Sequence, residues 1–433
     1  MTIFALSSAP GRAAVAVIRV SGPSAGAAVR TLTARDLPPP RQAVLRRLYE
    51  GGEGVIDEAL VLWFAGPASE TGEDMAEFQV HGGRAVVSGV LGALARIPGL
   101  RPAEPGEFTR RALLNGKLDL LGAEAVADLA DADTAVQRDQ ALDQLGGGLS
   151  GLYDGWWQRL ITQMAHVEAL IDFSDEDLPD DPAAGLHGEL ETLQAEIRAH
   201  LADDRRSQRL REGLHVVILG APNVGKSSLL NRLARRDAAI VASEAGTTRD
   251  VVEVTLDLGG FPVILSDTAG LREQAGIVEQ EGMRRAVARA ESADLRLVVA
   301  DGSRWGETWQ AVAHHVDEYA VIVANKSDLA DGSGMSALPV SCETGEGLDG
   351  LVREIETRLH RRWNTGGPGP TRERHRAGLE QALLALDRAG KGEEAALIAE
   401  DLRLAATALG RITGRVDVED LLDVIFAEFC IGK

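Results

Sequence analysis

The sequence predicts a multi-domain protein made of an α+β N-terminal domain, an all-α helical domain, and an α/β domain inserted into the helical one. Short apolar stretches broken by Gly and Pro clusters fill the start of the chain, which indicates strands and turns. Ala- and Leu-rich stretches with helical spacing lie on both sides of a region where apolar strands alternate with amphipathic segments. At 433 residues the chain also exceeds what one hydrophobic core usually organises.

The expected domains follow one another along the chain. Residues 1–118 contain the strand-like stretches "AAVAVIRV" and "EALVLWF", so we expect the α+β domain there. Residues 119–212 have the helical pattern of "LETLQAEIRAHLADDRR" and form the first part of the helical domain. In residues 213–365 the strands "LHVVILG", "FPVILSD", "DLRLVVAD" and "YAVIVANK" each lead into a loop and a helix, which is typical of a parallel sheet. After the linker "WNTGGPGPT", residues 366–433 complete the helical domain.

Charge and cysteine content limit the possible functions. With 45 Lys and Arg against 66 Asp and Glu, a net charge of −21 argues against general adhesion to nucleic acid. An RNA partner would need a local basic patch, for which residues 203–211 and 371–376 are candidates, although solvated helix ends explain each cluster equally well. The two cysteines, Cys342 and Cys430, cannot form a disulfide framework. The chain has no spanning apolar run and no signal-peptide pattern, so we expect a cytoplasmic protein without a membrane partner.

The α/β region contains a phosphate-loop motif, "GAPNVGKSS", which begins at Gly220 and lies between a strand and a helix. Its glycines let backbone N–H groups wrap phosphates, Lys226 can reach the outer phosphate oxygens, and Ser227 can bind Mg²⁺. The motif "DTAG" follows the next apolar strand, where Asp267 can hold Mg²⁺ through water and the Gly270 amide can contact the γ-phosphate. This pair of motifs predicts a nucleoside triphosphate site.

Two further motifs predict that the base is guanine. "NKSD" begins at Asn325 after another strand, and the carboxylate of Asp328 can pair with two donors on one edge of guanine that adenine does not offer. "SCETGEG", beginning at Ser341, completes the base pocket. The four motifs in this order resemble the Ras-like P-loop GTPases of the translation-factor-related class.

The residue that activates water is not obvious from the motifs. Ras-like enzymes use a Gln directly after "DxxG", but Leu271 stands there. Glu273, Glu279 and Glu281 are candidates in the following segment, and a solvated acidic helix face is the alternative interpretation. Sequence spacing alone does not choose among them.

The charge that an arginine finger would supply also has no obvious source. The loop "SEAGTTRD" offers only Arg249, and its Thr248 is the expected second Mg²⁺ ligand. A monovalent cation could take the role of the finger, and Asn223 in the phosphate loop provides an oxygen ligand for it.

Motifs outside the α/β region carry a more specific resemblance. With "GRAAVAVIRVSG", "TGEDMAEFQVHGG" and "PGEFTRRALLNGKLDL" near the start and "FCIGK" at residues 429–433, essentially the whole chain resembles the MnmE (TrmE) family of tRNA uridine modification GTPases. The resemblance implies an enzyme that acts with the FAD-dependent partner MnmG (GidA) in a heterotetramer or larger complex. Together they would add an aminomethyl or carboxymethylaminomethyl group at C5 of the wobble uridine of certain tRNAs. It also implies a homodimer formed through the N-terminal domain, and K⁺-dependent GTP hydrolysis in which the GTPase domains dimerise.

The resemblance further implies site residues and cofactors. The one-carbon donor would be 5-formyl- or 5,10-methylene-tetrahydrofolate, and Glu279 would position water. Folate would be bound by Arg19, Glu77, Lys117 and Lys433; Mg²⁺ by Ser227 and Thr248; and K⁺ by Asn223 and Thr247 with the backbone carbonyls of Ala242 and Glu244. The GTP site would comprise Asn223, Val224, Gly225, Lys226, Ser227, Ser228, Ala242, Ser243, Glu244, Ala245, Gly246, Thr247, Thr248, Asp267, Thr268, Ala269, Gly270, Asn325, Lys326, Ser327, Asp328, Ser341, Cys342 and Glu343.

Three alternatives stay open at this point. A regulatory GTPase of ribosome assembly would share the nucleotide motifs, but no GXXG-centred RNA-binding segment follows them here. A folate-binding structural protein with a vestigial nucleotide site is disfavoured by the intact Lys226, Thr248 and Asp267. Cys430 is a candidate catalytic nucleophile that could add to C6 of uridine, and a structural or redox-accessory role is equally compatible with the sequence.

Overall fold

A computed structural model describes most of the chain in two compact units. It covers residues 1–51, 54–172, 185–236, 253–267, 293–329, 336–363, 368–416, 419–427 and 429–432. One unit comprises Met1–Ala127, Gln144–Glu191 and Gly378–Lys433, and the other comprises Asp128–Asp143 and Thr192–Ala377. These divisions cut the chain differently from the boundaries expected after residues 118, 212 and 365, which stay a prediction.

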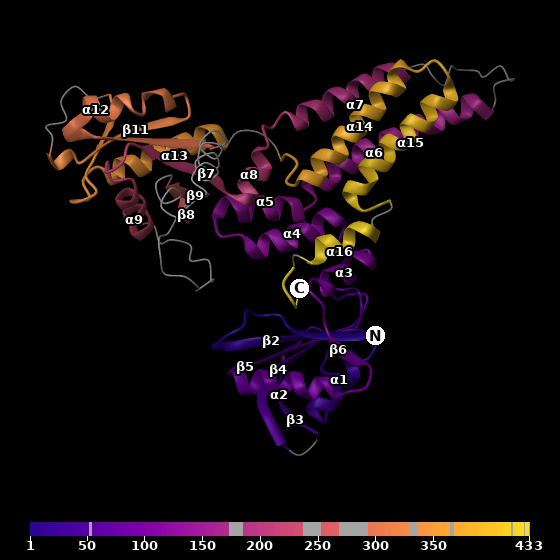
Figure 1. Cartoon of the computed structure of the whole chain (residues 1–433). Coiled ribbons are helices and arrows are strands. Elements are labelled where there is room, and N and C mark those ends of the chain that lie inside the picture. The colour runs from indigo at the N-terminus through magenta and orange to yellow at the C-terminus, as the bar shows by residue number, and fades with distance from the viewer. Residues whose placement is uncertain are drawn as a thin grey trace, which may run out of the picture. The chain divides into compact units, whose positions relative to one another are not determined.

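A six-stranded sheet forms the N-terminal part of the first unit (Figure 1). Its strands are β1 (Thr2–Leu6), β2 (Ala13–Ser21), β3 (Val44–Glu50), β4 (Gly54–Phe64), β5 (Met75–Gly82) and β6 (Leu100–Pro102), in the order β3-β4-β5-β2-β1-β6. Neighbours are antiparallel except β1 and β6. Helices α1 (Ala25–Thr33) and α2 (Arg84–Ala95) pack on one face, over buried strand residues such as Ile18, Val61 and Phe78.

The opposite face of this sheet is more exposed and carries both apolar and charged side chains. Leu45 on β3 stands directly opposite Leu60 on β4, and these side chains are 60% and 40% exposed. Along the same face, Arg19 on β2 stands opposite Glu77 on β5. Leu62 on β4 stands opposite Glu77, and Leu60 lies two residues before Leu62 on the same face of the strand, so the charged pair and the apolar pair lie on one surface.

Helices make up the rest of the first unit. The long helices α6 (Gly148–Asp172) and α15 (Ala395–Thr413) pack along each other. Helix α16 (Glu419–Ala427) packs on α3 (Glu107–Leu114), where Phe426 and Phe429 lie over Gly106. A Cβ at Gly106 would lie 2.8 Å from the Phe426 ring, and its φ is +66°, so glycine is required for this approach. Of the other helices outside the α/β domain, α8 (Arg206–Glu212) lies in the second unit. A boundary between the units falls within each of α4 (Leu120–Asp131), α5 (Ala135–Leu145), α7 (Leu186–Leu201) and α14 (Glu373–Lys391).

The second unit contains the α/β domain. Its sheet has the order β12-β11-β10-β7-β9-β8, and all pairs are parallel except β8 with β9. The strands are β7 (Leu214–Gly220), β8 (Glu253–Leu258), β9 (Phe261–Asp267), β10 (Leu295–Asp301), β11 (Ala320–Asn325) and β12 (Leu338–Val340). Its helices include α9 (Lys226–Arg236), α12 (Trp305–Gln310) and α13 (Leu348–Trp363). Each of the four expected strands is present, and the predicted fold class is confirmed.

Strand β8 was not expected from the sequence. Every second residue of "EVTLDL" is polar, and only Val254, Leu256 and Leu258 are buried. An antiparallel edge strand needs just one apolar face, so this strand lacks the continuous apolar run by which the buried parallel strands were recognised.

Within the described residues, no helix has the length and apolar composition to cross a membrane.

Candidate functional site

The phosphate loop connects the end of β7 at Gly220 to the start of α9 at Lys226. Asn223 has φ +63° and Gly225 has φ +98°. A Cβ at Gly225 would lie 2.2 Å from Nδ2 of Asn325, so only glycine fits there. Lys226 is 6% exposed, and its Nζ donates to the Ala221 carbonyl at 2.9 Å, across the loop. The loop thus brings a lysine ammonium to the N-terminus of a helix, where free N–H groups favour an anion.

Two oxygen ligands lie beside the phosphate loop. Asp267 ends β9 and stands opposite Ile218 of β7, which places its carboxylate next to the loop. The Ser227 hydroxyl donates to Oδ2 of Asp267 at 2.6 Å. A hydroxyl and a carboxylate are hard oxygen donors of the kind Mg²⁺ prefers, so these two residues fit that ion.

Asn325, at the end of β11, joins the phosphate loop to the loop that begins at Ser341. Its Nδ2 donates to the Val224 carbonyl at 2.7 Å, and its Oδ1 accepts from the Cys342 N–H at 3.2 Å. Asn325 is 1% exposed, so both bonds are shielded from water. The side chain of the "NKSD" asparagine therefore holds the two loops together.

Lys326 makes a second connection to the phosphate loop. Its Nζ donates to the Asn223 carbonyl at 3.0 Å and to Oδ2 of Asp301 at 2.7 Å. Asp301 ends β10 and is 1% exposed. Burial acts to raise the pKa of this carboxyl, but hydrogen bonds from Lys326 and Ser303 outweigh it and hold the pKa below its usual value. Asp301 is thus a buried carboxylate that orients a lysine of the base-recognition motif.

The loop that begins at Ser341 has a defined shape. The Ser341 hydroxyl accepts a hydrogen bond from the Thr344 N–H at 3.1 Å, and the Ser341 carbonyl accepts one from the Gly345 N–H at 2.9 Å. Arg232 on α9 donates to the carbonyls of Cys342 and Glu343, at 2.7 and 2.6 Å. Burial raises the pKa of the Cys342 thiol to about 11, against the opposing effects of Arg232 and Asn325, so this thiol is protonated at neutral pH.

These elements surround a cavity within the range of about 300 to 1,000 Å³ that is typical of small-ligand sites. Its volume is ≈ 680 Å³. It is lined by Gly225, Ser228, Asn231, Arg232, Arg235, Asn325, Lys326, Asp328, Leu329, Cys342 and Glu343. The lining comes from the phosphate loop, α9, the end of β11 and the Ser341 loop, that is, from the carboxyl edge of the parallel sheet where ligands of such folds bind.

The structure brings many of the predicted nucleotide-site residues together at this edge. They are Asn223, Val224, Gly225, Lys226, Ser227, Ser228, Asp267, Asn325, Lys326, Ser327, Asp328, Ser341, Cys342 and Glu343. Other predicted residues lie outside the described part of the chain: Ala242, Ser243, Glu244, Ala245, Gly246, Thr247, Thr248, Thr268, Ala269, Gly270, Glu279 and Lys433.

Sequence reasoning missed Asp301 and Arg232. Asp301 could have been noticed, because it ends the apolar strand "DLRLVVAD" as Asp267 ends "FPVILSD". Arg232 gave no such signal, since a basic residue inside an amphipathic helix is usually solvated.

The predicted folate residues Arg19 and Glu77 form an ion pair across the N-terminal sheet. Nε and Nη2 of Arg19 donate to Oε1 of Glu77 at 3.1 and 3.0 Å. A second carboxylate, on Glu70, lies 2.9 Å from Nη1 of Arg19. The guanidinium also lies 5.8 Å from the centre of the Phe108 ring, within the range of a cation–π contact. This cluster pairs one cation with two carboxylates, of which that of Glu70 is the more exposed.

Lys117 contacts the loop that carries Glu70. Its Nζ donates to the Pro67 carbonyl at 3.1 Å, and the neighbouring Asn115 donates to the Thr71 carbonyl at 2.7 Å. The loop between β4 and β5 therefore contacts Arg19 through Glu70 and also contacts Lys117.

The segment "FCIG" of residues 429–432 packs against the N-terminal sheet domain. The Cys430 carbonyl accepts the Gly106 N–H at 3.3 Å, and Ile431 forms an antiparallel bridge with Pro105. A Cβ at Gly432 would lie 2.3 Å from the Leu6 carbonyl, at the end of β1. Since Ala5 on that strand is the register partner of Arg19, the tail reaches the region of the Arg19 cluster. The Cys430 side chain is exposed.

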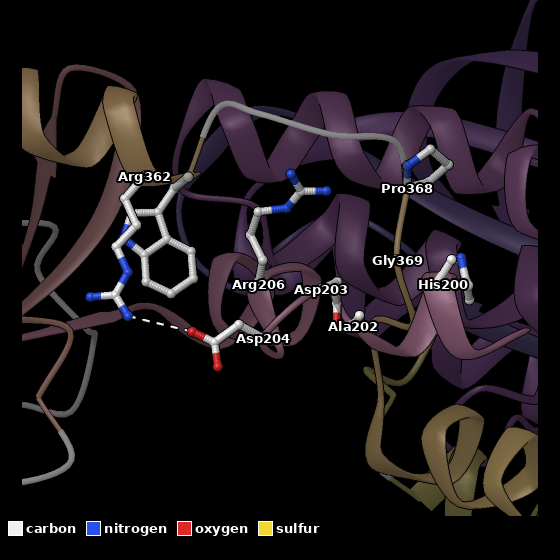
Figure 2. Close-up of a pocket in the computed structure, with 10 residues that line it drawn as sticks. His200, Ala202, Asp203, Asp204, Arg206, Arg362, Pro368 and Gly369 are labelled. Atoms are coloured by element: carbon white, nitrogen blue, oxygen red, sulfur yellow. Dashed lines mark hydrogen bonds and ion pairs between the residues drawn. The ribbon is translucent and has the colours of Figure 1, made fainter. Parts of the chain in front are cut away.

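The two basic clusters of residues 203–211 and 371–376 are largely neutralised within the chain. Figure 2 shows Arg362 and Asp204 at the wall of a second cavity of ≈ 420 Å³, where Nη2 of Arg362 lies 3.5 Å from Oδ2 of Asp204. Further ion pairs are Arg205–Glu373, Arg209–Asp294, Arg211–Asp128, Arg372–Asp128 and Arg376–Asp203. These arginines bind carboxylates of the same unit, so the structure favours an architectural role over a phosphate-binding one for both clusters.

Comparison with known proteins identifies the family. A model described as "GTP-binding protein TrmE N-terminus" matches residues 2–117, and one described as "MnmE helical domain" matches residues 120–430. A tRNA modification GTPase MnmE of Paramagnetospirillum magneticum is 55% identical over 439 residues, covering 100% of this chain and 99% of that protein. The chain belongs to the MnmE family.

Other MnmE relatives extend the similarity to distant organisms. The tRNA modification GTPase MnmE of Rhodospirillum rubrum is 53% identical over 453 residues, covering 100% of this chain and 99% of that protein. A mitochondrial 5-taurinomethyluridine tRNA synthase subunit of Homo sapiens is 50% identical over 458 residues, covering 100% of this chain and 93% of that protein. Similarity to MnmE therefore spans both the N-terminal sheet domain and the nucleotide cavity.

Proposed function

We propose that this chain is the GTP-hydrolysing component of a tRNA modification enzyme. The observation that carries the proposal is the convergence of Lys226, the Ser227–Asp267 pair and Asn325 around one cavity at the carboxyl edge of a parallel sheet. The MnmE relatives are named as tRNA modification GTPases, and this chain covers almost their full length. Binding of GTP and modification of tRNA are therefore proposed for the same polypeptide.

The geometry supports specific roles for the phosphate-site residues. The first turn of α9 would bind phosphate oxygens through its N–H groups, and Lys226 would exchange the Ala221 carbonyl for the outer phosphates. Ser227 and Asp267 would hold Mg²⁺, directly and through water, together with Thr248. When bound there, Mg²⁺ would neutralise charge that develops on the phosphates.

Potassium dependence and water positioning are the finer parts of the proposal. Asn223 in the phosphate loop would contact K⁺ with Thr247 and the carbonyls of Ala242 and Glu244, which lie outside the described residues. GTP turnover should then fall sharply when Na⁺ replaces K⁺, and equal rates in the two salts would remove Asn223 from the mechanism.

Glu279 would position the attacking water. The Glu279→Ala variant should slow hydrolysis with GTP binding nearly unchanged. Wild-type turnover in that variant would reassign the role.

The N-terminal domain supports a folate site and a homodimer. Arg19 could bind the carboxylate tail of tetrahydrofolate and Glu77 its pterin edge, with Lys117 and Lys433 as further cations. The exposed Leu45 and Leu60 lie on the same face of the sheet as Arg19 and Glu77, so a second copy that covered this apolar surface would enclose the folate site. Dimerisation through this domain is therefore part of the proposal.

Partner and location complete the proposed function. The chain would act with the FAD-dependent protein MnmG, in the cytoplasm, to modify C5 of the wobble uridine with a one-carbon unit from 5-formyl- or 5,10-methylene-tetrahydrofolate. Cys430 is exposed and its carbonyl is anchored at Gly106, which leaves the thiol free to approach a substrate. Whether the nucleophile is Cys430 or a group on MnmG is decided by Cys430→Ser, because retained modification would exclude the thiol.

Nucleoside mass spectrometry of tRNA from a strain that lacks this gene tests the proposal. We expect the modified wobble uridine to disappear, to return with the wild-type gene, and to stay absent with the Lys226→Ala gene. Unchanged nucleosides in the deletion strain, accompanied by a defect in ribosomal subunits, would instead support a regulatory GTPase of ribosome assembly.

A further inference from the structure

One arginine connects the phosphate-binding helix to the loop beside the base. Arg232 lies on α9, the helix that begins with Lys226, and it donates Nε to the Cys342 carbonyl and Nη2 to the Glu343 carbonyl. Two donors of one planar guanidinium thus bind two successive carbonyls, a geometry that a lysine or an amide cannot reproduce. The helix itself is anchored, because Leu229, Leu230 and Leu233 are at most 1% exposed.

The two bonds fix the direction of the peptide groups in the loop. A trans peptide is planar and its C=O and N–H point in opposite directions, so a carbonyl held toward Arg232 turns the following N–H away from it. The N–H that follows the Glu343 carbonyl belongs to Thr344, and it donates to the Ser341 hydroxyl at 3.1 Å. The N–H that follows the Cys342 carbonyl belongs to Glu343, which lines the cavity. Arg232 therefore determines which polar groups of the loop the cavity presents.

We propose that Arg232 is a positioning residue for guanine, which holds the Ser341–Glu343 loop so that the backbone N–H of Glu343 faces the base. Guanine carries an acceptor, O6, where adenine carries an amino donor, so a backbone donor fixed at this position favours guanine. Asn325 holds the loop from the other side through the Cys342 N–H. The inference rests on the proposed function, since it assumes that the cavity binds a guanine nucleotide.

The test measures nucleotide binding and turnover by the full-length protein. We expect Arg232→Gln to weaken GDP binding about tenfold, because two charge-assisted hydrogen bonds to the loop are lost. Arg232→Lys retains one donor and should recover part of that loss. IDP, which keeps O6, should weaken by the same factor as GDP. At saturating GTP the turnover should stay within about twofold of wild type while KM rises, because the phosphate-site residues are not moved.

Arg236→Gln is the matched control. Arg236 lies on the same helix and pairs with Asp349 rather than with the Ser341 loop, so its loss removes the same charge without releasing the loop. Its GDP affinity should stay within about twofold of wild type, and the thermal unfolding midpoints of the two nucleotide-free glutamine variants should agree.

Three results would overturn the inference. If Arg232→Gln binds GDP as tightly as Arg236→Gln does, the hydrogen bonds from Arg232 to the Ser341–Glu343 loop are not needed for guanine binding. If turnover of Arg232→Gln falls while its KM is unchanged, Arg232 acts in the phosphate chemistry instead. If Arg232→Gln does not fold, the third result that would overturn the inference is a wild-type GDP affinity in Arg232→Lys. Failure of the wild-type protein itself to bind GDP would refute the proposed function instead.

Discussion

The nucleotide cavity and the Arg19 cluster place their charged side chains by different means. In the α/β domain the residues follow the ends of parallel strands, at Gly220, Asp267, Asp301 and Asn325, and the sheet brings these ends to one edge. In the N-terminal sheet Arg19 and Glu77 lie within strands and are 58 residues apart, and only the register of β2 against β5 makes them neighbours. A parallel sheet therefore converts short local motifs into a site, whereas an antiparallel sheet builds one from residues that no local motif connects.

The two sites also differ in how their charges are satisfied. Lys226, Lys326 and Asn325 each donate to a carbonyl of the phosphate loop and so hold the cavity in shape. Arg19 is instead bound by two carboxylates, and the Arg19 and Glu77 side chains are 17% and 14% exposed. A ligand of the N-terminal site must compete with an existing ion pair, so selectivity there depends on what the ligand offers in exchange.

Removing the C-terminal segment should give the largest difference in effect between the N-terminal site and the nucleotide cavity. Deletion of Cys430 to Lys433 removes the bridge to Pro105 and the contact with Leu6 but changes no residue of the nucleotide cavity. We expect modified wobble uridine to fall below detection in complemented cells, with GTP turnover of the purified protein within about twofold of wild type. Retained modification would refute an active-site tail, and lost GTP turnover would show that the two sites are not independent.

Neutralising Arg19 should have a smaller effect on the same site. Arg19→Gln removes the cation that binds both Glu70 and Glu77, so tetrahydrofolate binding should weaken about tenfold while GDP binding is unchanged. Isothermal titration calorimetry with each ligand measures both quantities. Arg47→Gln on β3 serves as a control, because Arg47 forms a solvent-exposed pair with Glu58. Equal folate affinity in the two variants would remove Arg19 from the site.

The difference between the sites explains what the sequence could predict. The four expected strands are largely continuous apolar runs, and three of them lead into nucleotide motifs, so they predicted both the fold and the cavity edge. Strand β8 was missed because its pattern is half polar, and Arg232 was missed because its contacts with Cys342 and Glu343 depend on the tertiary fold. Arg19 and Glu77 entered through family resemblance, since neither a lone arginine nor a lone glutamate indicates a partner in another strand.

The two basic clusters show that a local charge pattern can also suggest a binding site that the structure does not favour. Charge density alone made residues 203–211 and 371–376 candidates for RNA contact. The structure pairs Arg209 with Asp294 and joins both clusters through Asp128, which bonds Arg211 and Arg372. The carboxylates that neutralise these arginines are distant in sequence, so no local pattern could have shown them.

Asp301 offers the mildest change and tests the nucleotide site alone. In Asp301→Asn the Lys326 ammonium loses its carboxylate partner but keeps the Asn223 carbonyl, so KM for GTP should rise about threefold with turnover nearly unchanged. Steady-state kinetics measures both, with Asp317→Asn as a control, since Asp317 pairs with Arg296 on the surface. A change in turnover without a change in KM would contradict a role in orienting Lys326.

Acid unfolding gives an independent check on Asp301. Its pKa is lowered from the ordinary value of 3.8, so the folded protein binds this proton less readily than the unfolded chain does. The carboxylate therefore contributes stability above about pH 4 and loses that contribution as pH falls through the lowered pKa. Asp301→Asn should lose less unfolding free energy than wild type over this acid range, as measured by denaturant titration at each pH. Because the Arg19 cluster is unaltered in this variant, tetrahydrofolate binding at neutral pH should match wild type, and a loss there would show that the nucleotide cavity and the N-terminal site are coupled.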